Sequence, residues 1–150
     1  MAKYLTKESL EKFKKELEYL EKTKRKEIAD KLKQAISFGD LSENAAYTEA
    51  KEEQSFLEGK ILELKRFVSE AKIINKKETS QVQIGSTVFV KLGNNKEKFL
   101  IVEPEEADIL SGKISYFSPV GKSLLGKRKG DIVKIETPEG KTEYKIIEIE

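Results

Sequence analysis

Two carboxylates, Asp40 and Glu43, lie three positions apart in a short break between two long stretches of helical periodicity. The sequence of the break is Phe38-Gly39-Asp40-Leu41-Ser42-Glu43-Asn44. If the flanking helices pack against each other, the pair lies at the far end of a hairpin, away from any core. Carboxylates are suitable ligands for a hard metal ion, so this pair is the best guide in the chain to a function.

The residue types that are absent restrict this chemistry. The 150 residues include no Cys, which excludes disulfides, thiolate catalysis and zinc–thiolate sites, and no His, the commonest general base. A metal held by side chains therefore needs oxygen ligands, which suit Mg²⁺, Mn²⁺ or Ca²⁺. Charged residues make up 37% of the chain, which fits long solvated helices, whereas the net charge of +2 gives no general sign of nucleic-acid binding.

The first predicted helix begins after Thr6, its N-cap, and ends at Gly39, a C′ residue of left-handed conformation. Apolar residues repeat along one face at spacings of three and four, stop, and then resume. The interruption around residues 22–26 predicts a continuous helix whose contact with its partner loosens there. The apolar residues are Leu10, Phe13, Leu17 and Leu20, followed by Ile28, Leu32 and Ala35.

The second predicted helix has Ser42 as its N-cap, with Glu43 and Asn44 in its first turn. Its apolar face alternates spacings of four and three, which is typical of a coiled coil. Each arm has about 30 residues and a length of roughly 45 Å, and the short connection makes the arms antiparallel neighbours. The face consists of Ala50, Gln54, Leu57, Ile61, Leu64, Val68 and Ala71.

The second half of the chain has a different period. A polar linker, 76–80, separates the hairpin, 1–75, from a β-rich domain, 81–150. Alternating apolar residues predict five or six strands with one buried face, and Ser118 with Pro119 predicts a short helix through Leu125. The fold class is therefore α+β, a long antiparallel helical hairpin followed by a small antiparallel β-sheet domain. We expect strands at 82–84, 87–92, 99–102, 114–117, 131–136 and 142–149.

The residues alone leave the role of the two acids open. Charged residues are common in loops, and Asp and Ser are ordinary capping residues. A structural coiled coil whose loop happens to carry acids therefore fits the pattern as well as a functional acidic site does.

The segment Gly39-Asp40-Leu41-Ser42-Glu43-Asn44-Ala45-Ala46-Tyr47 resembles the tip of bacterial Gre-type transcript cleavage factors, a family of transcription elongation factors. Ser118-Pro119-Val120 with Leu124-Leu125-Gly126-Lys127 resembles the helix of the family's C-terminal domain. Thr137-Pro138-Glu139-Gly140 resembles its last hairpin turn, so the likeness extends along essentially the whole chain. The resemblance implies that an FKBP-like C-terminal domain binds bacterial RNA polymerase and that the coiled coil enters the polymerase's secondary channel.

The resemblance also implies a function. The protein would stimulate the polymerase's own Mg²⁺-dependent cleavage of backtracked RNA 3′ ends, and would not be an enzyme by itself. Asp40 and Glu43 would hold Mg²⁺ or position its bound water, because two-metal phosphodiester hydrolysis needs a second Mg²⁺ on the side of the attacking water. Carboxylates three apart at a helix start can lie within reach of one ion. Two protein ligands bind Mg²⁺ weakly, so the ion is expected to be shared with the polymerase.

Neighbouring residues receive roles by the same resemblance. Ile36 and Ala46 replace a basic and an acidic residue that are common in the family, which leaves the RNA contact open and makes Asp40 and Glu43 the only obvious acids of the tip. Lys51 is expected either to contact RNA phosphate or to be an ordinary exposed charge. The remaining roles are tip support for Gly39, Ser42, Asn44 and Tyr47, and polymerase binding, or simple helix capping, for Ser118, Pro119 and Val120.

Two other functions compete with this one. A binding-only relative would block the same channel without shortening RNA, and the intact acid pair argues against it. A structural or chaperone coiled coil with an isomerase-like domain would need an aromatic-lined pocket, whereas the aromatic residues of the β half mostly alternate along strands and are expected to pack. These are Phe89, Phe99, Tyr116, Phe117 and Tyr144.

The sequence also bears on the location of the protein. It lacks the roughly 18 consecutive apolar residues that a transmembrane helix needs, and its first residues lack the apolar core of a signal peptide. We therefore expect a cytoplasmic monomer with no membrane partner.

Overall fold

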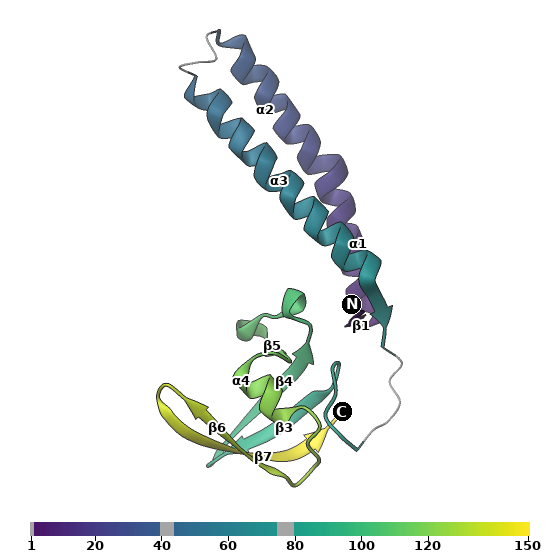
Figure 1. Cartoon of the computed structure of the whole chain (residues 1–150), viewed down its shortest axis with the longest axis vertical. Helices are drawn as coiled ribbons and strands as arrows, with labels where there is room; N and C mark the ends of the chain where they lie inside the picture. The colour runs from purple at the N-terminus through teal and green to yellow at the C-terminus, as the bar shows by residue number, and fades with distance from the viewer. Residues whose placement is uncertain (1, 40–43, 75–79) are drawn as a thin grey trace. The chain divides into compact units, whose positions relative to one another are not determined.

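The structure, a computed structural model, describes residues 2–39, 44–74 and 80–150. Its contacts divide the chain into two compact units: residues 7–71 form a helical hairpin, and residues 2–6 with 72–150 form a β-rich unit. Figure 1 shows the two kinds of architecture, which confirm the predicted α+β class. The sequence placed residues 2–6 with the hairpin, whereas their contacts group them with the β-rich unit.

The contacts of the first strand explain this grouping. Strand β1 (Lys3–Leu5) pairs with β2 (Ala71–Ile73), a two-stranded sheet that the sequence did not indicate. The Tyr4 N–H donates to Oε1 of Glu103 at 2.9 Å, and the Lys3 ammonium lies 2.9 Å from a Glu105 carboxylate oxygen. The hydrogen bond to Glu105 raises the pKa of Lys3.

Four segments build the hairpin: α1 (Lys7–Glu18), η1 (Tyr19–Lys24), α2 (Arg25–Ser37) and α3 (Ala45–Glu70). Helix α3 runs back along the first arm (Figure 1). Its 26 residues give it a length of about 39 Å, so the antiparallel hairpin of the prediction is present.

Segment η1 is a π-helix, and it replaces the loosened contact that the sequence predicted at residues 22–26. Leu20 and Ile28 are eight residues apart, about 2.2 turns of an α-helix, so an unbroken α-helix would turn them towards different directions. The wider i→i+5 turns of a π-helix take up the difference. Both side chains are buried in one cluster with Leu57 and Ile61 of α3.

The β-rich unit contains a five-stranded sheet with the strand order β5-β4-β3-β7-β6. Its neighbours are antiparallel except for β4 and β5, which are parallel. The stretch predicted as a strand at 82–84 is not one, although Gln81 beside it forms an isolated bridge with Arg128. The elements are β3 (Thr87–Leu92), β4 (Asn95–Val102), β5 (Lys113–Ser115), β6 (Ile132–Thr137) and β7 (Gly140–Ile149), with short helices η2 (Pro104–Glu106), η3 (Ile109–Ser111) and α4 (Pro119–Leu124).

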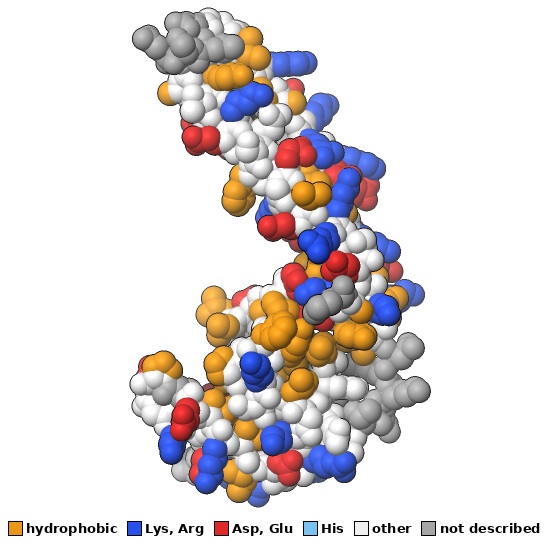
Figure 2. All heavy atoms as spheres, viewed as in Figure 1, with side chains coloured by type: hydrophobic (Ala, Val, Ile, Leu, Met, Phe, Trp, Pro, Cys, Tyr) orange, Lys and Arg blue, Asp and Glu red, His pale blue; other side chains and the backbone are white. Residues whose placement is uncertain are grey.

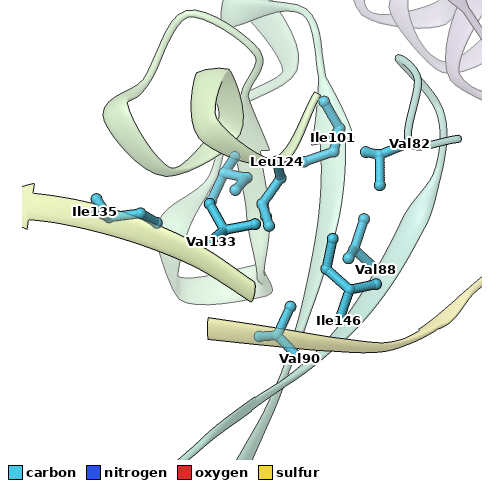
Figure 3. Packing of buried hydrophobic residues seen from close by; sticks show 9 residues of the cluster. Val82, Val88, Val90, Ile101, Leu124, Val133, Ile135 and Ile146 are labelled. Carbon is cyan, nitrogen blue, oxygen red and sulfur yellow. The ribbon is translucent and has the colours of Figure 1, made fainter. Parts of the chain in front are cut away.

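One face of this sheet carries the core, as the alternating pattern predicted. Val88 and Val90 of β3 are fully buried, and Val133 and Ile135 of β6 are nearly so. Successive side chains of a strand point to opposite faces, so each of these pairs faces the same way. Figure 3 shows them packed together with Leu124 of α4 and with neighbouring strands. The other members of this core are Val82, Ile101, Ile114 and Ile146.

Candidate functional site

Asp40 and Glu43, with Leu41 and Ser42 between them, lie outside the described residues. Their predicted roles in metal binding and tip support therefore stay predictions. The residues on both sides are described, and they show how the two helices end at the turn of the hairpin.

Helix α2 ends as the sequence indicated. Phe38 is its C-cap, with its N–H bonded to the Ala35 carbonyl at 3.2 Å. Gly39 follows with a φ of +105°, a conformation that favours glycine. Its N–H donates to the Ile36 carbonyl at 3.2 Å, so the backbone of this helix end is held by two hydrogen bonds.

Helix α3 begins two residues later than predicted, and its N-cap is Asn44 instead of Ser42. Asn44 Oδ1 accepts a hydrogen bond from the Tyr47 N–H at 3.1 Å. An amide oxygen at this position satisfies an otherwise unpaired backbone donor of the first turn. Helix α3 begins at Ala45, so Asp40 and Glu43 both precede it in the sequence. Helical spacing therefore gives no reason to expect the two carboxylates within reach of one ion.

The same Asn44 side chain also joins the two helices, because its Nδ2 donates to the Ala35 carbonyl of α2. A single amide thus caps α3 and bonds to the last turn of α2. Two small residues lie in the same part of the hairpin, Ala35 at 1% exposure and Ala50 at 3%. The contacts of Asn44 are those that a tip-supporting residue needs, although the role itself is still a prediction.

Ion pairs between the arms add to this contact. Arg25 binds Glu58 through two hydrogen bonds, from Nε and Nη2, at 2.9 and 2.8 Å. Closer to the turn, Lys31 Nζ lies 3.1 Å from a Glu53 carboxylate oxygen. Each of these pairs joins α2 to α3.

Lys51 is exposed on the second turn of α3. Its ammonium lies 5.9 Å from the centre of the Tyr47 ring and donates to Oε1 of Gln54 at 3.4 Å. Tyr47 is half-buried. The cation therefore lies against an aromatic face, about two turns from the N-cap of α3, and this position suits either of the roles that the sequence left open.

The last turn of α2 contributes no cation, since its residues are Gln34, Ala35, Ile36 and Ser37. Instead, Ile36 is 53% exposed and Phe38 is 74% exposed. Figure 2 shows hydrophobic side chains on the surface at this end of the hairpin. Phe38 had no predicted role, although its position directly before Gly39 and Asp40 in the sequence could have drawn attention to it.

Ser118 is the N-cap of α4. Helix capping was one of the two roles that the sequence predicted for it. Its Oγ accepts from the Gly121 N–H at 3.0 Å and donates to the Ser115 carbonyl at 2.6 Å. Pro119, at the first helical position, is exposed, and Val120 packs against the core. Polymerase binding by these residues remains a prediction.

The aromatic residues of the β-rich unit mostly pack, as expected. The rings of Phe99 and Tyr144 meet edge to face at 5.9 Å beside the core, and burial raises the pKa of Tyr144. Tyr116 packs against the same core and lies 4.2 Å from the Phe117 ring. Phe117 differs because it is 55% exposed. Phe89 is half-buried outside this core, with the Lys98 ammonium 5.7 Å from the centre of its ring.

No helix in the described part of the chain is both long enough and apolar enough to cross a membrane. Taken with the fold, the chain is a helical hairpin with two acids in the sequence between its helices, followed by a β-rich unit.

Comparison with known proteins assigns the chain to a family. The model of the N-terminal domain of GreA/GreB transcription elongation factors matches residues 3–73, and the model of their C-terminal domain matches residues 76–150. The chain therefore belongs to the GreA/GreB family of transcription elongation factors.

Two relatives named as transcription elongation factor GreA agree with the family assignment. The chain is 49% identical to transcription elongation factor GreA of Thermoanaerobacter pseudethanolicus over 97% of this chain and 95% of the relative. It is 46% identical to GreA of a Clostridium botulinum strain over 97% of this chain and 93% of that protein. A crystal structure of GreA factor homolog 1 from Thermus thermophilus is 29% identical, covers 100% of this chain and 99% of its own, and has a TM-score of 0.48.

Proposed function

We propose that this elongation factor stimulates the intrinsic RNA cleavage of bacterial RNA polymerase in backtracked complexes and so restarts arrested transcription. The observation that carries the proposal is the construction of the hairpin. A helix of about 39 Å and its partner both end beside the segment that contains Asp40 and Glu43. Asn44 joins the two helix ends there. In the sequence, the helices of the hairpin thus separate the two acids from the β-rich unit.

The donor chemistry of the acid pair fits Mg²⁺, because carboxylate oxygens are hard ligands. Asp40 and Glu43 would be the residues that hold the ion. A bound Mg²⁺ would supply the second metal of a two-metal phosphodiester hydrolysis. Two carboxylates make an incomplete coordination sphere, so we propose that the polymerase and the RNA phosphate complete it, and that the protein lends ligands without catalysing alone.

The remaining predicted contacts have partners of different chemistry. Lys51 can meet a phosphate of the nascent RNA from its position against Tyr47. Pro119 is exposed beside the cap of α4 and is available to the polymerase, whereas Ser118 and Val120 also serve the fold of the unit. We propose that the protein acts as a monomer, with the β-rich unit binding the polymerase.

A cleavage assay on stalled, backtracked complexes tests this proposal. Asp40→Asn with Glu43→Gln should abolish stimulated cleavage, because both changes keep the size of the side chain and remove its charge. Glu49→Gln with Glu52→Gln is the matched control, since it removes two exposed charges of α3 and leaves the acid pair intact. The proposal fails if the Asp40 and Glu43 variant stimulates cleavage as well as the wild type.

The same assay distinguishes the competing function. A protein that slows nucleotide addition and leaves the RNA at full length would be a channel-binding inhibitor. Stimulated release of short 3′ fragments by the wild-type protein would exclude that role under the conditions of the assay.

A further inference from the structure

Phe38 is a large aromatic side chain that the fold leaves in solvent. It is 74% exposed, although Ala35 in the preceding turn of the same helix is almost fully buried. Exposed aromatic rings are common enough singly to need no explanation by themselves. The position of this ring does need one, because only Gly39 separates it from Asp40 in the sequence.

The backbone that carries the ring is fixed. Phe38 has helical dihedral angles as the C-cap of α2, and the N–H groups of Phe38 and Gly39 both bond to carbonyls of the last turn. Asn44 bonds that turn to the start of α3. An exposed side chain on a fixed backbone is preorganised for contact, since little further ordering is needed when a partner arrives.

The charges around the ring determine which partner it suits. The last turn of α2 has no cation to attract phosphate, and the residues that follow Gly39 in the sequence include two acids. The last turn of α2 by itself therefore attracts the phosphates of RNA poorly. It does not repel the uncharged face of a nucleobase, and aromatic side chains bind unpaired bases by stacking.

We propose that Phe38 stacks on an unpaired base at the 3′ end of backtracked RNA and so positions that end at the acid pair. This inference rests on the proposed function. Stacking tolerates every base because each has a π face. Stacking therefore suits a factor that must act on transcripts of any sequence. It would also replace an RNA contact that a basic residue at position 36 could have made, since this chain has Ile36 there.

Substitutions at Phe38 test the stacking. With subsaturating factor, we expect Phe38→Ala to lower the rate of stimulated cleavage about tenfold, in line with the loss of one base stack. Phe38→Trp should keep or raise the rate. Phe38→Leu should fall towards the alanine variant, because leucine is apolar but has no ring. Equal rates for the leucine variant and the wild type would overturn stacking.

Phe56 provides the matched control, since it is 77% exposed on α3 and is distant in sequence from the acids. Phe56→Ala should leave the cleavage rate unchanged. Binding of each variant to polymerase without RNA is measured alongside. If Phe38→Ala weakens that binding, the ring contacts the polymerase protein and the inference is wrong.

An RNA whose unpaired 3′ nucleotide lacks its base distinguishes stacking from a purely structural role of Phe38. In backtracked complexes assembled with this RNA, the wild type and Phe38→Ala should cleave at the same rate, because there is no base to stack. A tenfold difference that persists would contradict the inference. A wild-type protein that stimulates no cleavage on any RNA would overturn the proposed function as well, whereas equal Phe38 variants beside an active wild type would overturn only the stacking.

Discussion

The helical hairpin and the β-rich unit bury their side chains in different ways. The hairpin has a thin seam, in which Leu20, Ile28, Leu57 and Ile61 form the buried cluster. The β-rich unit encloses a cluster of nine buried residues between its sheet and α4. Charged side chains of both signs alternate over the surface of the hairpin (Figure 2), and several of them form ion pairs.

This difference indicates where each unit tolerates change. An exposed residue of the hairpin touches little, so substitutions there should act on partner contacts more than on folding. In the β-rich unit, the buried residues pack against one another, and atoms added to a closely packed interior are expected to clash with their neighbours.

Gly121→Ala should destabilise the β-rich unit by roughly 3 kcal/mol or more. Gly121 is buried in α4, and an added Cβ would lie on the carbonyl oxygen of Ser115. That oxygen already accepts hydrogen bonds from the N–H and the Oγ of Ser118, so it cannot move away without breaking the cap. Urea unfolding followed by peptide-resolved hydrogen exchange would measure the effect in each unit.

The control for this substitution is a glycine of the hairpin. Gly59 lies in the middle of α3, and an added Cβ there would meet no atom within 4 Å. Alanine is the better helix former, so Gly59→Ala should stabilise the hairpin by up to about 1 kcal/mol. If both alanine variants have the same effect, the contrast between a filled core and an open helix surface is wrong.

Asn44→Ala should destabilise the hairpin by about 1 to 2 kcal/mol, because the cap of α3 and the bond to α2 are both lost. Asn44→Asp separates the two contacts. A carboxylate can still accept from the Tyr47 N–H, but it cannot donate to the Ala35 carbonyl. We expect hydrogen exchange to increase at the start of α3 for alanine and much less for aspartate. Equal exchange in the two variants would mean that the cap contributes nothing.

The apolar spacing predicted most of the architecture. Helix α4 was placed correctly because Ser118 and Pro119 specify a helix start through local chemistry. The buried face of the sheet was predicted because apolar residues such as Val88 and Val90 recur at every second position. Local signals of this kind depend only on neighbouring residues. They are therefore visible without the tertiary structure.

The features that sequence reasoning missed depend on distant partners. Strands β1 and β2 have three residues each, too few for a periodic pattern, and β1 is held by Glu103. Ser42 and Asn44 are both good capping residues, so local sequence did not distinguish them. The N-cap in the structure is Asn44, whose side chain also bonds to α2. The π-helix η1 follows from packing Leu20 and Ile28 on one partner, and the pattern alone did not distinguish it from a loosened helix.

The smallest predicted effect concerns the ion pair between Arg25 and Glu58 on the surface of the hairpin. The hydrogen bond from Arg25 lowers the pKa of Glu58 below its ordinary value of 4.5. A carboxyl group whose pKa is lower in the folded state stabilises the fold above its unfolded pKa, and this contribution is lost as the pH falls through the folded pKa. Both side chains are exposed, so water and salt screen the pair and the gain is small.

Glu58→Gln should therefore lower the Tm of the hairpin by only about one or two degrees near pH 7, and the difference should shrink as the pH falls through the lowered pKa of Glu58. Thermal melts of both proteins at neutral pH and at a series of acidic pH values would show this. Glu18→Gln is the control, because Glu18 pairs with Lys22 along one arm of the hairpin and joins no second helix. If the difference for Glu58 persists at low pH, the carboxyl group acts by packing and not by its charge, and the contrast between a charge-stabilised hairpin surface and a packed β-rich core becomes weaker.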